Sequence, residues 1–202
     1  ERNTMQVVKM QTKEGEIEAQ SHLYGQFNQQ NLLTAIAAGS FLGVSPQMIK
    51  AGIECYVPEN NRSQVLEVGS WTIYLDAYNA NPTSVRHALR FSSSHSAEGE
   101  SIVILGDMLE LGEDSISIHT EILNEAASMP RLDYILLVGP LFGRAMKGFT
   151  GDSTSVLHFD NIEAARYWFL DQAFERCSIL LKGSRKMALE RFLKNLSHKE
   201  SE

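Results

Sequence analysis

The sequence predicts an α/β protein whose main sheet is mostly parallel and carries helices on both faces. From residue 62 onward, short runs of aliphatic and β-branched residues alternate with segments of helical periodicity. This alternation is typical of strand–helix–strand units, in which each helix crosses back over the sheet. Several of the strand runs end in polar or glycine-bearing loops, and open α/β sheets bind their ligands at that edge. Residues 1–58 do not follow this alternation, so we expect them to belong to a separate domain.

The composition bounds the size, compartment and partners of the protein. A chain of 202 residues fits one large domain or one and a half small ones. Its formal net charge of −7 argues against a nucleic-acid partner. Cys55 and Cys177 lie far apart without metal-type spacing, which indicates buried thiols in a reducing compartment. No apolar run reaches membrane-spanning length and no signal peptide opens the sequence, so we expect a cytoplasmic protein without membrane contact.

The first segment predicts a β-hairpin. Met5–Met10 and Glu16–His22 are strand-like runs, and Lys13-Glu14-Gly15 between them has turn chemistry. An isolated hairpin is marginally stable in water, so we expect this one to join a larger sheet. We therefore expect the chain to begin partway through a domain.

Two helices are predicted after the hairpin. Residues 28–42 have apolar side chains at helical spacing, with Asn28 as the N-cap and Asn31 in the first turn. If these asparagines bind no ligand, they only cap and solvate the helix. A second helix begins at Ser45-Pro46, with serine as the N-cap and proline at the first position, and runs towards Glu54.

The polar, proline-containing stretch Tyr56–Arg62 separates two predicted domains, residues 1–58 and 62–202. In the second, a hairpin over Leu66–Leu75 turns at Gly69-Ser70 and adds an antiparallel edge strand. The predicted strands of the parallel sheet are Thr72–Leu75, Ile102–Leu105, Tyr134–Val138, Ser155–Phe159 and Ile179–Lys182. The helices between them begin near Thr83, Ser115, Leu141 and Asn161. A last helix is predicted from about Lys186 to Leu196, followed by a frayed polar tail at residues 197–202.

The rest of the chain is organised around the stretch Asp76–Ser84. A buried strand precedes it and a helix follows, with Pro82 in the first turn, where its missing N–H costs nothing. Asp76 therefore lies at the carboxyl end of a strand, in a loop that also contains Asn79 and Asn81. Ligands bind at this edge of open α/β sheets. The alternative is an Asx-rich turn that only connects the two elements.

Other strands also end in polar or glycine-bearing loops, at Gly106–Gly112, Gly139-Pro140 and Lys182–Arg185. Because parallel strands end at one edge of the sheet, the charged residues of these loops would meet in a polar cleft. These residues are Asp76, Asp107, Glu110, Lys182 and Arg185. Gly-Asp or Gly-Pro after a strand is also a common plain turn. Lys-Gly-Ser-Arg is less ordinary, since two cations and backbone N–H groups at a helix N-terminus suit a phosphate or carboxylate.

His119 lies in the helix that Ser115 opens, close in sequence to several carboxylates. His119 is a candidate metal ligand, and the alternatives are a surface histidine or a buried, hydrogen-bonded one. The sequence offers no metal-ligand spacing, no Ser–His–Asp or Cys–His arrangement, no Gly-x-Gly-x-x-Gly fingerprint and no Gly-x-x-x-x-Gly-Lys-[Ser/Thr] loop. A nucleotide could therefore contact this chain without its triphosphate being cradled by it.

Five motifs, taken in order, resemble those of the Mur ligases. They are Asn28-x-x-Asn31-x-x-x-Ala35-x-Ala37-Ala38, Tyr56-x-Pro58-x-Asn60-Asn61-Arg62-Ser63-Gln64, Asp76-Ala77-Tyr78-Asn79-Ala80-Asn81-Pro82-Thr83-Ser84, Leu105–Glu113 with His119, and Lys182-Gly183-Ser184-Arg185. The Tyr-Asn-Ala-Asn-Pro and Gly-Asp-Met-x-Glu-Leu-Gly motifs resemble, within that family, the ligases that join D-alanyl-D-alanine to UDP-N-acetylmuramoyl-tripeptide in bacterial cell-wall synthesis. The resemblance covers nearly all of the chain. Lys186 departs from it, because glycine is expected after the Lys-Gly-Ser-Arg run.

The resemblance implies a domain architecture. Mur ligases have an N-terminal domain for the UDP-sugar, a central ATPase domain and a Rossmann-like C-terminal domain. Residues 1–58 would be the end of the central domain, and residues 62–202 the C-terminal domain. The phosphate loop, the Mg²⁺ ligands and the modified lysine of the family would belong to a part that this sequence does not contain, so the chain alone is expected to be inactive.

The resemblance also implies a reaction and a role for each site residue. ATP phosphorylates the carboxylate of UDP-N-acetylmuramoyl-tripeptide, and the amine of D-alanyl-D-alanine attacks the acyl phosphate. The implied nucleotide contacts are Asn31 with adenine, Arg62 with the phosphates and Asp76 with the ribose hydroxyls, while Asn79 and Asn81 order the loop. The implied dipeptide contacts are Lys182, Ser184 and Arg185, and Asp107, Glu110 and His119 would line the same cleft. Domain closure would bring these groups to the acyl phosphate and exclude water.

Two other functions remain open on the sequence. A different amide ligase of the same superfamily, such as a folylpolyglutamate synthase, would share the architecture, although the Tyr-Asn-Ala-Asn-Pro loop speaks against it. A non-catalytic nucleotide-binding or interaction module is compatible with the absence of a phosphate-loop motif.

Overall fold

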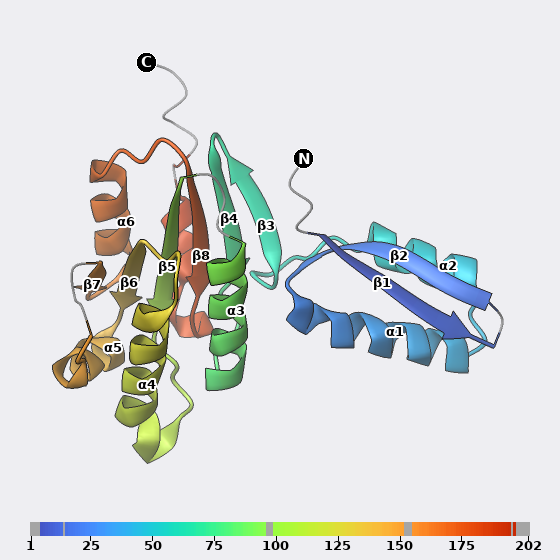
Figure 1. Cartoon of the computed structure of the whole chain (residues 1–202), viewed down its shortest axis with the longest axis horizontal. Helices are drawn as coiled ribbons and strands as arrows, with labels where there is room; N and C mark the ends of the chain where they lie inside the picture. Colours follow the sequence, from blue (N-terminus) through green and yellow to red (C-terminus); the bar gives the residue numbers. More distant parts are fainter. Residues whose placement is uncertain (1–4, 14, 96–98, 152–154, 195, 197–202) are drawn as a thin grey trace. The chain divides into compact units, whose positions relative to one another are not determined.

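A computed structural model describes residues 5–13, 15–95, 99–151, 155–194 and 196 (Figure 1). The chain divides into two compact units. The first comprises Glu1–Glu59 and Ser63–Val65, and the second comprises Asn60–Arg62 and Leu66–Glu202. Glu14 of the predicted turn and the polar tail at residues 197–202 lie outside the described residues.

The first unit is a two-stranded antiparallel sheet packed against two helices. The strands are β1 (Met5–Thr12) and β2 (Gly15–Tyr24), and the helices are α1 (Gln29–Phe41) and α2 (Pro46–Cys55), with a short 3-10 turn η1 (Gln26–Asn28) before α1. In β2, burial alternates from Glu16 to His22, so one face of the hairpin packs inward. That face and the two helices form one core of Val8, Ile17, Ala19, Leu32, Ile36, Ile49 and Ile53. The helices, rather than further strands, stabilise the hairpin within the described residues.

Two expectations about this unit are corrected. Ser45 does cap α2, since its side chain accepts a hydrogen bond from the Met48 N–H. Asn28, in contrast, has helical backbone angles and makes no side-chain cap. Its buried amide donates instead to the Tyr24 carbonyl (2.8 Å) and to Ser63 Oγ (3.0 Å). Cys55, which we expected to be buried, is exposed at the end of α2.

The second unit contains the predicted parallel sheet. Its six strands lie in the order β3-β4-β8-β5-β6-β7, and the pairs from β4 to β7 are all parallel (Figure 1). The two-residue turn Gly69-Ser70 joins β3 to its neighbour β4, so this edge strand is antiparallel, as predicted. The strands are β3 (Gln64–Val68), β4 (Trp71–Asp76), β5 (Glu100–Gly106), β6 (Tyr134–Val138), β7 (Val156–Phe159) and β8 (Cys177–Lys182).

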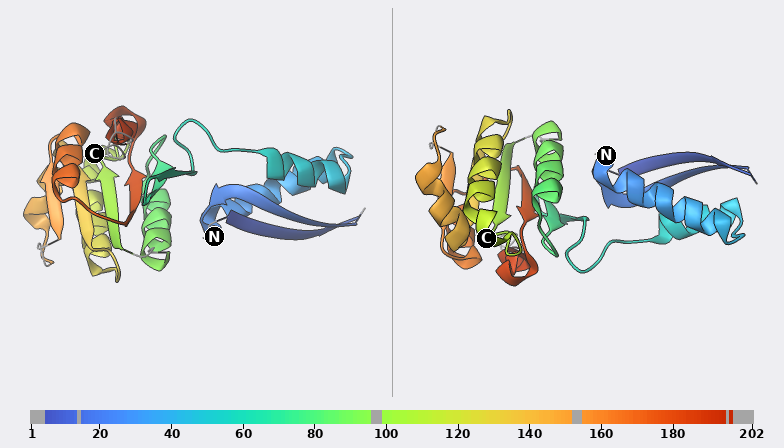
Figure 2. Two further views of the ribbon diagram at one scale, coloured as in Figure 1. Left: turned by 90° about the horizontal axis from the view of Figure 1, so that it is seen from above. Right: turned by 90° about the horizontal axis from the view of Figure 1, so that it is seen from below.

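Helices cover both faces of this sheet, which confirms the α/β fold class. One face carries α3 (Pro82–Ser94) and α4 (Ser115–Ser128), and the other carries α6 (Ile162–Asp171) and η5 (Leu189–Leu193) (Figure 2). The remaining elements are α5 (Pro140–Ala145) and the 3-10 helices η2 (Gly112–Asp114), η3 (Met146–Gly148) and η4 (Arg185–Met187). On the α6 face, the buried strand residues Ile73, Ile104 and Ile179 belong to one core with the helices.

The last predicted helix, from Lys186 to Leu196, is wrong. The segment forms two short 3-10 helices, η4 and η5, separated by Ala188 in a left-handed conformation with φ 50°. Leu189 and Phe192 are both fully buried, and the ring of Phe192 lies 5.1 Å from that of Phe169 on α6. Their spacing of three residues satisfies a 3-10 turn as well as an α-helix. The apolar pattern was therefore a packing signal rather than an α-helical one.

Candidate functional site

The strand register brings Asp76 and Lys182 together at the carboxyl ends of β4 and β8. The two residues are direct partners in the parallel pairing, although 106 positions separate them in sequence. Lys182 Nζ donates to Asp76 Oδ2 (2.8 Å) and to the Asn79 carbonyl (2.7 Å). Lys182 is only 2% exposed, and the Asp76 side chain is 15% exposed. This ion pair is the centre of the polar edge that the sequence predicts.

The loop after Asp76 is held by its own side chains. Asn81 and Ser84 form a capping box at the start of α3: Asn81 Oδ1 accepts from the Ser84 N–H, and Ser84 Oγ accepts from the Asn81 N–H. Asn79 Oδ1 accepts from the Ala80 N–H at 2.8 Å. Together with the Lys182 contact, these bonds tie the loop to both α3 and β8. Asn79 and Asn81 thus both make hydrogen bonds within the loop and the first turn of α3.

Arg62 lies against the same loop. Its guanidinium stacks over the ring of Tyr78, with Cζ 3.7 Å from the ring centre. The Ala77 N–H also donates to the Asn61 carbonyl at 2.8 Å, which fixes the backbone beside Arg62. Tyr78 is 40% exposed and was missed as a site residue. The only signal in the sequence was an aromatic residue inside a polar loop, which does not indicate a partner.

Asp107 and His119 lie beneath the Gly106–Gly112 loop, and neither is exposed. Asp107 accepts from the N–H groups of Leu141 and Phe142, both at 2.9 Å, and so caps the start of α5. This requires glycine at position 139, where a Cβ would lie 2.5 Å from Asp107 Oδ2. His119 Nε2 accepts from the Met108 N–H at 3.0 Å. Both side chains thus hold the loop from inside, whereas Glu110 is exposed on it.

The contacts of His119 define its protonation state. Nε2 accepts a hydrogen bond, so Nδ1 carries the proton and donates it to the Ser115 carbonyl at 2.6 Å. Burial lowers the pKa of His119 from its usual value of 6.5, against smaller opposing effects of the Ser115 carbonyl and of Asp107. The imidazole is therefore neutral at pH 7 and acts as a structural hydrogen-bonding group.

The Lys182–Arg185 loop is joined to the Gly106–Gly112 loop. Ser184 Oγ accepts from the Leu109 N–H (3.1 Å), and the Ser184 N–H donates to the Asp107 carbonyl (3.2 Å). A Cβ at Gly183 would lie 2.9 Å from the Gly106 Cα, so the two loops approach closely. Arg185 pairs with Glu190 at 2.9 Å, and its side chain remains 56% exposed. The helix that follows is the three-residue 3-10 helix η4, a weaker anion site than the expected helix N-terminus.

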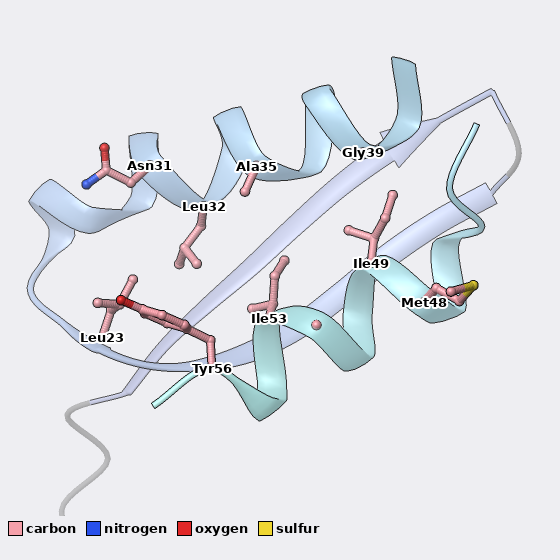
Figure 3. A pocket seen from close by; sticks show the side chains of 10 residues that line it. Leu23, Asn31, Leu32, Ala35, Gly39, Met48, Ile49, Ile53 and Tyr56 are labelled. Carbon is pink, nitrogen blue, oxygen red and sulfur yellow. The ribbon is translucent and has the colours of Figure 1, made fainter. Parts of the chain in front are cut away.

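Asn31 belongs to the first unit. It is exposed in the first turn of α1, and its amide donates to Asn28 Oδ1 at 3.1 Å. It lines a pocket of about 410 Å³ between α1 and α2, which is mainly apolar (Figure 3). The other lining residues are Leu23, Leu32, Ala35, Gly39, Met48, Ile49, Gly52, Ile53 and Tyr56.

The described part of the chain has neither a membrane-spanning helix nor a cluster of metal-ligand side chains. In these ranges, no helix is long and apolar enough to span a membrane. Nor do any three or more histidine, cysteine, aspartate or glutamate side chains there form a group that could hold a metal ion.

Known proteins that resemble this chain are Mur ligases. Residues 61–185 match the family described as Mur ligase, glutamate ligase domain. UDP-N-acetylmuramoyl-tripeptide–D-alanyl-D-alanine ligases from Bacillus subtilis and Treponema pallidum are 31% and 37% identical over 86% and 88% of the chain. The chain spans 38% of the length of each of these relatives.

Solved structures agree with the sequence matches. A crystal structure of MurF from Acinetobacter baumannii superposes with a TM-score of 0.86 at 28% identity, covering 96% of this chain and 43% of that one. MurF from Thermotoga maritima, in complex with ADP, shares the fold with a TM-score of 0.76 at 19% identity, covering 98% and 44% of the two chains. The chain therefore belongs to the Mur ligase family, and within that family it is similar to the UDP-N-acetylmuramoyl-tripeptide–D-alanyl-D-alanine ligases.

Proposed function

We propose that this chain is part of an ATP-dependent amide ligase that joins D-alanyl-D-alanine to UDP-N-acetylmuramoyl-tripeptide in the bacterial cytoplasm. The observation that carries the proposal is the Asp76–Lys182 pair at the carboxyl edge of the sheet, which joins the start of the Asp76–Ser84 loop to the end of β8. In the proposed reaction, ATP, used with Mg²⁺, phosphorylates the carboxylate of the tripeptide. The amine of D-alanyl-D-alanine then attacks the resulting acyl phosphate. Residues 1–58 are the end of the central ATPase domain, and residues 62–202 are the C-terminal domain.

The residues proposed for the nucleotide fit its chemistry. The Asp76 carboxyl group offers two acceptor oxygens, and among the described residues only its Oδ2 atom has a hydrogen-bond partner, so Oδ1 can accept from a ribose hydroxyl. Arg62 presents a planar cation that suits phosphate oxygens and is already stacked in place on Tyr78. Asn31 borders an apolar pocket, which suits the flat face of adenine with one amide at its edge.

The residues proposed for the dipeptide differ in what they offer. Arg185 presents an exposed guanidinium that can bind the carboxylate of D-alanyl-D-alanine. Ser184 is buried, and its hydroxyl and N–H are already bonded within the Gly106–Gly112 and Lys182–Arg185 loops. Lys182 is buried as well, with its ammonium committed to Asp76 and Asn79. Arg185 is therefore the strongest of the three as a dipeptide contact.

Replacing Asp76 tests the proposed function in the full-length ligase. Asp76→Ala should raise the KM for ATP about tenfold or more, because a hydrogen bond to a charged group contributes about 1.5–3 kcal/mol. The KM for D-alanyl-D-alanine should change much less. Asp160→Ala is a matched control, since Asp160 is exposed just after the edge strand β7. An unchanged ATP requirement in steady-state kinetics would remove Asp76 from the nucleotide site.

A further inference from the structure

The environment of Lys182 conflicts with a role in binding the dipeptide. Its ammonium is buried at the end of β8, and two strong acceptors hold it at 2.8 and 2.7 Å. To reach a substrate carboxylate, Nζ would have to leave both acceptors inside the protein. Removing one partner of a buried ion pair is strongly unfavourable, because the other charge is left uncompensated.

The same two contacts control the geometry on the nucleotide side. One hydrogen bond holds Asp76 Oδ2 and so restricts rotation of the carboxylate, whose other oxygen, Oδ1, has no partner among the described residues. The other hydrogen bond holds the Asn79 carbonyl, three residues further along the loop. The loop is fixed again at Asn81 by the capping box of α3. A single ammonium therefore sets both the carboxylate and the backbone that follows it.

We propose that Lys182 is a positioning residue for the nucleotide: it orients the Asp76 carboxylate towards the ribose hydroxyls and does not contact the dipeptide. This inference rests on the proposed function, in which Asp76 accepts hydrogen bonds from the ribose. It assigns the two cations of the Lys-Gly-Ser-Arg run to different substrates, Lys182 to the nucleotide side and Arg185 to the dipeptide side.

Two pairs of substrate analogues test the proposal in the full-length ligase. The first pair is ATP and 2′,3′-dideoxy-ATP, which lacks the ribose hydroxyls. The second pair is D-alanyl-D-alanine and its C-terminal amide, which lacks the carboxylate charge. The ratio of kcat/KM within each pair measures how strongly the enzyme uses that group. A residue that only stabilises the fold would change neither ratio.

Lys182→Met removes the ammonium while retaining most of the side-chain volume. It should reduce the preference for ATP over the dideoxy analogue about tenfold, the effect of one charged hydrogen bond. The preference for the dipeptide over its amide should remain that of the wild type. Asp76→Asn should lose the same ribose preference, and the double variant should lose no more than either single variant, because both act through one carboxylate.

Controls separate this effect from unfolding. Lys147→Met makes the same substitution at an exposed lysine on η3 and should leave both preferences unchanged. If Lys182→Met does not fold, as judged by thermal unfolding, Lys182→Gln keeps one donor and should show a partial loss of ribose preference.

The outcomes that overturn the inference differ from those that overturn the function. If the Lys182 variant keeps its ribose preference, or if it loses the preference for the dipeptide over its amide, Lys182 is not a positioning residue for the nucleotide. A wild-type enzyme that fails to ligate the dipeptide with ATP would instead overturn the proposed function. If the wild-type enzyme ligates the dipeptide but uses ATP and the dideoxy analogue equally well, Asp76 does not contact the ribose hydroxyls. Lys182 then has no role in orienting it towards them.

Discussion

Lys182 and Arg185, the two cations of the Lys182–Arg185 loop, are both paired with a carboxylate, but they differ in exposure. Lys182 is buried against Asp76, whereas Arg185 meets Glu190 with more than half of its side chain in solvent. An exposed ion pair contributes little to stability and exchanges readily for another anion. A buried ion pair does not exchange readily, because separating it leaves each charge uncompensated in an apolar interior. The two cations of one tetrapeptide therefore serve different purposes.

Arg185→Ala should weaken use of D-alanyl-D-alanine in the full-length ligase and spare formation of the acyl phosphate. Loss of a charge-assisted contact to a carboxylate predicts a KM for the dipeptide that is roughly tenfold higher. Glu190→Gln is the matched control, since it removes the ion pair but keeps the guanidinium. A dipeptide KM equal to that of the wild type in the Arg185 variant would show that Arg185 serves only its pairing with Glu190.

His119 predicts a pH dependence of stability. Because its pKa is lowered in the folded protein, the unfolded chain binds the proton more tightly, and protons favour unfolding. Its contribution is therefore present above pH 6.5 and is lost as the pH falls from there towards the folded-state pKa. His119→Gln retains a donor and an acceptor without titrating, and should flatten this part of the profile.

The measurement is the free energy of unfolding between pH 7 and pH 5, followed by tryptophan fluorescence. Trp71 and Trp168 both lie in the second unit and report on it alone. His87→Gln makes the same substitution on the exposed side of α3 and is the control for the replacement itself. Equal slopes in the wild type and the His119 variant would contradict the structural role of the neutral imidazole.

At the scale of elements, the sequence predicted those features that depend on residues close together in the chain. The strands, the helices α3, α4 and α6, and the Gly69-Ser70 turn follow from periodicity, caps and turn residues, and the structure has them. The last helix failed because burial of Leu189 and Phe192 is decided by packing against α6, which no local pattern encodes. The sequence predicted that Asp76 and Lys182 share one edge of the sheet. Their direct pairing and the Arg62–Tyr78 stack could not be predicted, since strand register and loop approach are non-local.

Two N-caps with the same chemistry allow stability to be separated from function. Asn81 caps α3 and Asn161 caps α6, and each side chain accepts a backbone N–H at 2.9 Å. Replacing either by alanine should cost about 1 kcal/mol of stability. Only Asn81→Ala should also raise the KM for ATP, because it loosens the Asp76–Ser84 loop. Similar kinetics of the two variants would mean that Asn81 is a cap and nothing more.

At the scale of the whole molecule, the two units should differ in stability. The second has a six-stranded sheet with helices on both faces, whereas the first has two strands and two helices around a core cluster of seven described residues. We expect residues 62–202 to fold as an independent unit. Amide hydrogen exchange should show residues 1–58 less protected than the strands of the second unit. Equal protection throughout would indicate one cooperative structure.

The 202-residue chain by itself should neither hydrolyse ATP nor ligate the dipeptide. Its sequence has no Gly-x-x-x-x-Gly-Lys-[Ser/Thr] loop, and catalysis of phosphoryl transfer depends mainly on such positioning of the triphosphate and its metal ion. Phosphate release should stay at background with ATP, Mg²⁺, UDP-N-acetylmuramoyl-tripeptide and D-alanyl-D-alanine all present. Turnover above background by the purified chain would mean that the catalytic groups lie within these residues.

The position of β8 has a consequence for how the protein is made. β8 is the last strand of the sheet in sequence, yet it lies between β4 and β5. Until it is inserted, β3-β4 and β5-β6-β7 have no strand pairing with each other. A ribosome must therefore deliver almost the whole second unit before its sheet can close, so the nascent polypeptide cannot fold strand by strand as it emerges. Because β8 also carries Lys182 to Asp76, the step that completes the core assembles the candidate site as well.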